Sequence, residues 1–250
     1  MTASWKSAWI VGASTGIGRD LVLHLARGGV ERVYASARSA DKLAALAGEL
    51  PAIRSVPLDV TDLESLRSAH DQIAADGALD LAVFNAGAYS PMGLKEWDLS
   101  IIRQNLAVNY EGVVNGLDVV LPAMRARRAG HIAVTASVAG YRGLPNALSY
   151  GPTKAALISL CETLHNELRD EGVRLQLINP GFVRTPLTDK NDFEMPQMIE
   201  PAEAADEIFK GLQSNKFEIA FPRPFAWQLM ALRMLPYPMF FAAMRKMMGH

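Results

Sequence analysis

The sequence predicts an α/β fold in which helices cover both faces of a parallel sheet of about seven strands. Short apolar runs rich in Val, Ile, Leu and Ala alternate with longer segments of helical periodicity. The runs do not alternate between apolar and polar residues, which is typical of strands buried on both faces. Such alternation of strands and helices implies right-handed crossovers and a three-layer α/β/α arrangement.

Strand and helix follow one another along the whole chain. The expected strands are Ser7–Val11, Arg32–Ala37, Ile53–Leu58, Leu79–Asn85, His131–Ala136, Val173–Ile178 and Glu218–Phe221. The expected helices are Gly16–Arg27, Asp41–Leu50, Asp62–Ala74, Leu99–Arg127, Tyr150–Glu171 and Ala202–Gln213. Because no repeat, low-complexity tract or linker interrupts them, we expect residues 1–250 to form a single domain.

The composition limits the kinds of partner and site. Lys and Arg number 25 against 26 Asp and Glu, so the formal charge is -1 and no basic field calls for a nucleic acid. The single cysteine, Cys161, lies among apolar helix residues, which predicts a buried thiol, no disulfide and no cysteine-based metal site. Residues 1–6 lack an apolar signal-peptide core, so we expect a soluble, cytoplasmic protein.

A glycine-rich turn lies directly after the first expected strand and opens the first helix. Glycines there permit a tight turn and let a phosphate approach the N–H groups at the positive end of the helix dipole. The spacing Gly-x-x-x-Gly-x-Gly differs from the common Gly-x-Gly-x-x-Gly fingerprint, and a purely structural turn is the alternative. Its place at the first strand–helix junction favours dinucleotide binding by a Rossmann-type fold. The candidate residues are Gly12, Ser14, Thr15, Gly16, Ile17 and Gly18.

The end of the second strand bears on the choice of dinucleotide. A carboxylate at this point would bind the ribose 2′-hydroxyl of NAD, whereas an arginine accommodates the 2′-phosphate of NADP. No carboxylate ends the strand, and Arg38 follows it. Arg38 could also be a solvated loop charge, but the pattern favours NADP(H) over NAD(H).

Tyr150 and Lys154 are four residues apart at the start of an expected helix, so their side chains project from one face. A phenol has a pKa of about 10 in water, and a neighbouring ammonium is expected to lower it. Ser137, from a separate element, would hold a carbonyl oxygen beside the phenol, as suits a general acid acting on a ketone or alcohol. Pro152 is tolerated only in a first helical turn, so the helix should begin near Tyr150.

With these elements in order, the chain resembles the short-chain dehydrogenase/reductase family along nearly its whole length. The glycine turn matches that family's own cofactor motif, and Ser137, Tyr150 and Lys154 match its catalytic positions. Asn109 falls where the family carries a catalytic asparagine. Further segments similar to the family's cofactor contacts supply Asp59, Val60, Asn85, Ala86, Gly87, Pro180, Gly181, Val183 and Thr185.

Several of these segments also have a structural explanation. Asp59 and the residues after it could cap a helix, Asn85 could be a turn residue, and Asn109 needs a hydrogen-bond partner in its apolar helix. In the family, the aspartate meets the adenine amine and the asparagine of Asn-Ala-Gly stabilises the fourth strand. Thr15 departs from the family pattern, because many NADP-preferring members carry a basic residue there, which leaves Arg38 alone to favour the phosphate.

The resemblance implies an NAD(P)-dependent oxidoreductase that moves a hydride between a nicotinamide cofactor and a carbonyl or alcohol substrate. Residues 1–130 would mainly bind the dinucleotide, and residues 131–224 would supply catalysis and the substrate side. It also implies a homodimer or homotetramer formed through the helices Leu99–Arg127 and Tyr150–Glu171. A catalytically silent dinucleotide sensor or scaffold is the alternative.

Two further segments are expected to shape the substrate side. The polar loop Thr188–Pro201 is either a substrate lid or an ordinary surface connection. Residues 225–250 form an apolar, Met-rich extension without a carboxylate and without an apolar run of the roughly 20 residues that span a bilayer. We expect this extension to cover the substrate pocket or form an oligomer contact, ahead of a peripheral contact with anionic lipid. An apolar pocket and a membrane contact would each suit a hydrophobic ketone as substrate.

Overall fold

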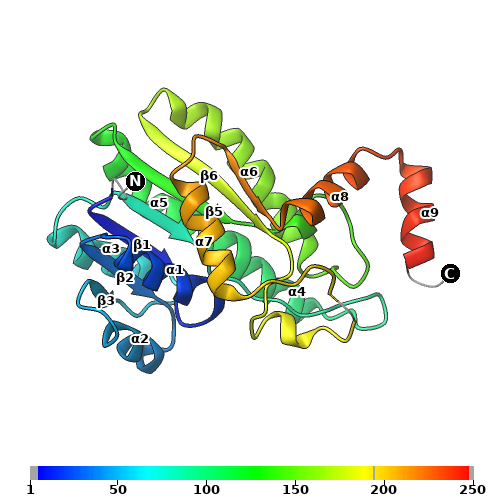
Figure 1. Ribbon diagram of the computed structural model, residues 1–250, viewed down its shortest axis with the longest axis horizontal. Helices are drawn as coiled ribbons and strands as arrows, with labels where there is room; N and C mark the ends of the chain where they lie inside the picture. The colour runs from blue at the N-terminus through cyan, green and yellow to red at the C-terminus, as the bar shows by residue number, and fades with distance from the viewer. Residues whose placement is uncertain (1–4, 194, 248–250) are drawn as a thin grey trace.

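The computed structural model describes residues 5–193 and 195–247 and contains a seven-stranded parallel sheet (Figure 1). The strand order β3-β2-β1-β4-β5-β6-β7 confirms the predicted doubly wound, Rossmann-type α/β fold. The winding reverses between β1 and β4, and sheets of this kind bind ligands beyond the carboxyl ends of their strands at that point. The strands are β1 (Ser7–Val11), β2 (Arg32–Ser36), β3 (Ile53–Ser55), β4 (Leu81–Phe84), β5 (Gly130–Thr135), β6 (Val173–Pro180) and β7 (Glu218–Phe221).

Helices cover both faces of the sheet (Figure 1). Because successive strand side chains point to opposite faces, Ile10 of β1 belongs to the core cluster that includes α1, α2 and α7, whereas Trp9 belongs to the cluster that includes α3, α5 and α6. The helices are α1 (Gly16–Arg27), α2 (Ala40–Ala47), α3 (Leu63–Ala75), α4 (Leu99–Leu106), α5 (Gly112–Ala126), α6 (Gly151–Arg169), α7 (Pro201–Leu212), α8 (Arg223–Arg233) and α9 (Tyr237–Met247).

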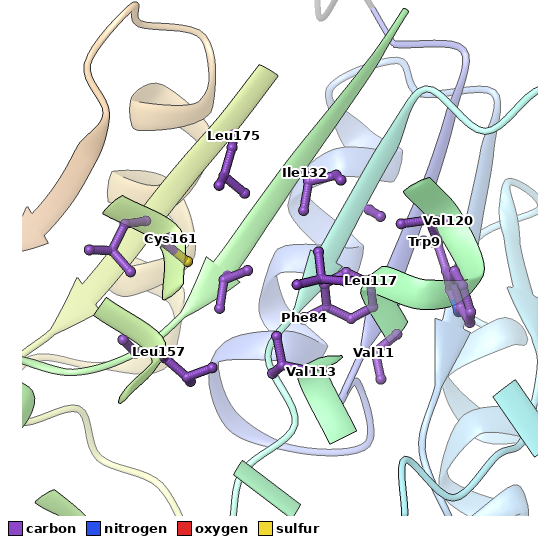
Figure 2. Packing of buried hydrophobic residues seen from close by; sticks show 14 of the residues in the cluster. Trp9, Val11, Phe84, Val113, Leu117, Val120, Ile132, Leu157, Cys161 and Leu175 are labelled. Atoms are coloured by element: carbon purple, nitrogen blue, oxygen red, sulfur yellow. The ribbon is translucent and has the colours of Figure 1, made fainter. Parts of the chain in front are cut away.

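The core beneath α5 and α6 extends across β2, β1, β4, β5 and β6, and Figure 2 shows part of it. Trp9 and Phe84, on neighbouring strands, stack edge to face with ring centroids 6.5 Å apart, and Leu117 of α5 packs in the same cluster. Cys161 of α6 is buried there as a free thiol, and burial raises its pKa to about 12. The prediction of a buried thiol is therefore confirmed.

The predicted helix Leu99–Arg127 is wrong as a single α-helix. A π-helical segment, Ala107–Glu111, separates α4 from α5. Asn109 lies in this segment and is fully buried, and its amide bonds to the backbone of Ala88. Turns of this kind are rare and occur often at functional sites.

The other predicted elements all occur: β1, α1 and β7 have the predicted bounds, and the ends of the rest are shifted by one to a few residues. The third strand ends at Ser55 instead of Leu58, although the N–H groups of Val56 and Leu58 still donate to the carbonyls of Ala35 and Ala37. Tyr150 is the residue that precedes α6, and Pro152 lies in the first turn, as predicted. Residues 225–250 fold as α8 and α9 as far as residue 247, and the remaining positions lie outside the described part of the chain.

Candidate active site

A cavity of about 430 Å³ opens where β1, β4, β5 and β6 end. The glycine turn and the ends of β2 and β3 line one part of it, and the start of α6 lines another. The loop after β6 and the inner face of α8 line the remainder. The fold therefore brings all the predicted segments to one edge of the sheet, as expected for an open α/β sheet.

The glycine turn is packed so closely that side chains are excluded. Gly12 has a φ of +94°, and a Cβ there would lie 2.4 Å from the backbone nitrogen of Ala86. A Cβ on Gly18 would lie 2.1 Å from the carbonyl oxygen of Gly12, to which Asn85 Nδ2 also donates a 3.2 Å hydrogen bond. This packing holds the N-terminus of α1 at the cavity, and the first turn of α1 carries no acidic residue. The cradle therefore fits an anionic group such as a diphosphate.

The ends of β2 and β3 supply the side chains expected at the adenosine half of a dinucleotide. Arg38 lines the cavity, is exposed, and forms no ion pair with any residue that the structure describes. Asp59 accepts hydrogen bonds from the Thr61 N–H at 3.0 Å and from its hydroxyl at 2.8 Å, both through Oδ1. Val60 lies beside it in the cavity wall. Asp62, and not Asp59, caps α3.

Ser137, Tyr150 and Lys154 lie together in the cavity wall. Ser137 follows β5, and its Oγ accepts from the Ala139 N–H at 3.1 Å and donates to the Pro180 carbonyl at 3.4 Å. Lys154 is buried; its Nζ donates to the Thr135 carbonyl at 2.8 Å and lies 5.5 Å from the centre of the Tyr150 ring. The spacing of these residues in the sequence thus becomes proximity in space.

The expectation that Lys154 lowers the pKa of Tyr150 is wrong for the protein without ligand. Burial of the phenol group raises the pKa of Tyr150 to about 12, although the side chain as a whole is only half-buried, and the adjacent Ser137 hydroxyl acts in the opposite direction. Burial also lowers the pKa of Lys154 to about 7, so the ammonium charge is itself disfavoured. Desolvation thus outweighs the attraction expected from spacing on a helix.

Asn109 connects two segments of the cavity wall through side-chain hydrogen bonds. Its Nδ2 donates to the Ala88 carbonyl at 2.9 Å and to Thr153 Oγ1 at 3.0 Å, while its Oδ1 accepts from the Ala88 N–H at 2.7 Å. These bonds join the chain after β4 to the first turn of α6, where Lys154 lies. Asn109 is not among the residues that line the cavity. Gly18 does not line it either, and its role is close packing of α1.

All other predicted site residues line the cavity. They are Gly12, Ser14, Thr15, Gly16, Ile17, Arg38, Asp59, Val60, Asn85, Ala86, Gly87, Ser137, Tyr150, Lys154, Pro180, Gly181, Val183 and Thr185. The segment after β6 crosses directly over the glycine turn, because a Cβ on Gly16 would lie 2.8 Å from Thr185 Cγ2.

An aromatic group on the substrate side was missed from the sequence. Tyr89 stacks edge to face on Tyr150 with ring centroids 5.0 Å apart, and its hydroxyl donates to Asn191 Oδ1 at 2.6 Å. Phe182 contacts both Phe193 and Phe225, with ring centroids 5.8 Å and 5.4 Å away. Tyr89 lies just beyond the end of β4, and this position is the sequence feature that could have predicted it as a site residue.

The loop Thr188–Pro201 and the extension both border the cavity. Thr188, Asn191 and Phe193 of the loop line it, and so do Phe225 and Leu229 of α8. Lys190 Nζ donates to the Tyr89 carbonyl at 2.7 Å, which ties the loop to the chain after β4. The loop is therefore a wall of the cavity, α8 lines another part of it, and α9 lies beyond α8 (Figure 1).

The fold and cavity define a nucleotide-binding α/β protein, and comparison with known proteins gives its family. The family model for short chain dehydrogenases matches residues 6–195. An uncharacterized oxidoreductase of Myxococcus xanthus is 37% identical over 249 residues, which cover 98% of each chain. The chain therefore belongs to the short-chain dehydrogenase family of oxidoreductases, as its motifs indicated.

Solved structures agree with this assignment. A short-chain dehydrogenase from Streptomyces avermitilis superposes with a TM-score of 0.81 at 27% identity and covers 92% of both chains. A short chain dehydrogenase from Burkholderia cenocepacia in complex with NADP superposes with a TM-score of 0.80 at 25% identity, over 93% of this chain and 100% of the other.

Proposed function

We propose that this protein is an NADP(H)-dependent oxidoreductase that interconverts a hydrophobic ketone or aldehyde and its alcohol. The observation that carries the proposal is one cavity that joins the glycine cradle to Ser137, Tyr150 and Lys154. The bound nicotinamide would supply or accept the hydride. The chain's own residues would place the substrate and manage the proton.

Tyr150 would exchange the proton with the substrate oxygen. With a pKa of about 12, its phenol is protonated at neutral pH and is ready to donate during carbonyl reduction. The Ser137 hydroxyl would hold the same substrate oxygen. A cationic Lys154 would stabilise the phenolate left behind and bind the nicotinamide ribose hydroxyls.

Asn109 would hold a water on the proton path between Lys154 and solvent. Both N–H groups of its amide already have acceptors, so such a water would donate to the backbone carbonyl or to the amide oxygen of Asn109. The hydrogen bond to Thr153, one residue before Lys154, supports this placement.

Arg38 supports the preference for NADP(H). It is exposed beside the cavity, has no partner carboxylate in the described parts of the chain, and is one of the cations that could face a 2′-phosphate. The neighbouring turn residues Ser14, Thr15 and Ser39 add polar groups at the same end. The complex of the Burkholderia cenocepacia relative with NADP supports the same choice.

The hydrophobic substrate is supported by the distribution of charge in the cavity wall. Arg38, Asp59 and Lys154 are its charged lining residues, and all three lie in the cofactor-binding or catalytic part. The rest of the wall is uncharged: it includes the aromatic and aliphatic residues Leu144, Phe182, Phe193, Phe225 and Leu229, together with the amides of Gln104 and Asn191. Among the lining residues that the structure describes, this part of the wall offers no counter-ion to a charged substrate.

Tyr150→Phe tests the proposal. NADPH binding, followed by fluorescence titration, should remain near normal, while NADPH oxidation with a panel of carbonyl compounds should fall roughly 10²–10⁴-fold. Tyr110→Phe, outside the cavity, is the matched control. Retained turnover in Tyr150→Phe would refute the catalytic assignment. NADPH binding by wild type without turnover on any carbonyl would instead favour the silent sensor or scaffold.

A homodimer or homotetramer and a cytoplasmic location complete the proposal. Exposed apolar side chains on α4 and α5, Leu99, Leu106 and Val114, support a contact between copies along these helices. Light scattering after size exclusion measures the assembly directly.

A further inference from the structure

The helices α8 and α9 expose apolar side chains that nothing in the described chain covers. On α8, Phe225 and Leu229 face the cavity, whereas Trp227 is 66% exposed, and Met234, directly after the helix, is 82% exposed. On α9, Phe240 is buried, but Phe241 is 51% exposed. Both helices lie at one end of the molecule (Figure 1). Exposed apolar groups collected in this way mark an interaction surface.

The position of this surface is fixed by Arg142. Its guanidinium donates to the carbonyls of Leu232, Arg233 and Leu235 at the turn between the two helices, at 3.1, 2.8 and 2.6 Å. It also lies over the Phe240 ring, 4.1 Å from its centre. The exposed side chains are therefore displayed from an anchored turn.

The charged residues of this segment are all positive. Between residues 219 and 250 the sequence has four cations, Arg223, Arg233, Arg245 and Lys246, and no Asp or Glu, although the whole chain has a formal charge of -1. All four side chains are exposed. Two carboxylates lie near the start of α8: Glu207 lines a groove there together with Lys210, Lys216 and Arg223, and Glu218 accepts hydrogen bonds from Tyr141 and Asn179.

We propose that the outer surface of α8 and α9 docks onto an anionic lipid bilayer. Exposed Trp, Met and Phe side chains beside unpaired cations match the interfacial mode, in which apolar groups enter the headgroup boundary and cations meet the lipid charge. No helix of the described residues is long and apolar enough to cross a bilayer, so the contact is peripheral.

A second copy of the chain fits this surface less well. In a two-fold contact the same patch meets itself, so cations would face cations with no carboxylate in the segment to pair them. Because the inner face of α8 lines the cavity, docking would also place lipid next to the proposed site of a hydrophobic substrate; this consequence alone rests on the proposed function.

Vesicle co-sedimentation of the full chain, without substrate or cofactor, tests the docking. The protein should bind vesicles that contain phosphatidylglycerol, bind them less at high salt, and bind pure phosphatidylcholine weakly. Two double variants should each weaken binding roughly tenfold or more. One replaces exposed apolar groups (Trp227→Ser with Met234→Ser), and the other replaces exposed cations (Arg245→Gln with Lys246→Gln).

Two matched pairs control for losses of the same kind elsewhere on the surface. Trp97→Ser with Leu94→Ser removes exposed apolar groups before α4, and Arg27→Gln with Arg169→Gln removes two exposed cations. These pairs should bind like wild type. If Trp227→Ser with Met234→Ser fails to fold, vesicle binding by Arg245→Gln with Lys246→Gln, at the exposed end of α9, still tests the docking.

Absence of wild-type binding to anionic vesicles would overturn the proposal. Equal loss in the control pairs would also overturn it, because the effect would then be one of general surface charge or hydropathy. A changed mass in solution for Trp227→Ser with Met234→Ser, with vesicle binding intact, would assign the surface to a second copy instead.

Discussion

Replacing Lys154 by Met should make the ligand-free protein more stable near neutral pH. Burial lowers the pKa of Lys154 from 10.5 to about 7, and at about 1.4 kcal/mol per pKa unit this corresponds to about 5 kcal/mol. The variant loses the hydrogen bond to the Thr135 carbonyl, which costs about 1–3 kcal/mol. We therefore expect a net gain of about 2–4 kcal/mol at pH 7 and below.

The sign of the pH dependence follows from proton binding. Because the pKa of Lys154 is lower in the folded state, the unfolded chain binds more protons between about pH 7 and 10.5, and wild-type stability rises with pH in that window. The advantage of Lys154→Met should accordingly shrink by about 3 kcal/mol between about pH 6.5 and about pH 9.5. Other groups titrate equally in both proteins and cancel in the difference.

Denaturant unfolding of both proteins without cofactor, at several pH values, measures this difference. Lys42→Met, on an exposed part of α2, is the control for losing a lysine. A difference between Lys154→Met and wild type that does not change with pH would refute the reasoning, because a desolvated ammonium must titrate differently in the two states. A variant less stable than wild type at pH 6.5 would show that the lost hydrogen bond dominates.

Three other variants probe separate parts of the site. Arg38→Gln should raise the KM for NADPH roughly 10–100-fold and change that for NADH little, because one charge-assisted contact is worth about 1.5–3 kcal/mol; equal effects in steady-state kinetics would remove Arg38 from cofactor selection. Asn85→Ala should lower the free energy of unfolding by about 1–2 kcal/mol and weaken NADPH binding, since Gly12 loses its hydrogen bond; unchanged cofactor titration would contradict this. Tyr89→Phe keeps the ring on Tyr150 but frees Asn191, so limited proteolysis of the loop should accelerate while NADPH binding is unchanged.

Local spacing predicted which residues come together in the cavity wall near Tyr150. The glycine turn, Ser137, Tyr150 and Lys154 each follow from a short stretch of sequence at the end of a strand, and the parallel sheet brings such ends together. The strands themselves were predictable because burial on both faces leaves an apolar run. The same logic placed Arg38 at the cavity, since it follows the next strand along the sheet edge, whereas Asp59 was predicted from the family resemblance alone.

Contacts between distant segments were not predictable. In the π-helical segment, Asn109 accepts a hydrogen bond from the Ala88 N–H, which lies 21 residues earlier in the chain. The loop after β6 is held by the hydrogen bond from Tyr89 to Asn191, which is 102 residues away. The predicted effect of Lys154 on Tyr150 failed for a related reason. Spacing on a helix reports which groups are neighbours, whereas their pKa values depend on how the whole fold excludes water.

The buried ammonium of Lys154 links stability to function. Its Nζ has three N–H donors, and the Thr135 carbonyl is its one acceptor among the residues that the structure describes, so the remaining donors are open to a ligand in the cavity. A group that lowers stability and remains in place calls for a functional reason. If ribose hydroxyls are its partners, NADPH should stabilise wild type more than Lys154→Met, and the variant should be inactive although it is more stable alone. Equal stabilisation of the two proteins by NADPH would leave Lys154 without a role in binding the cofactor.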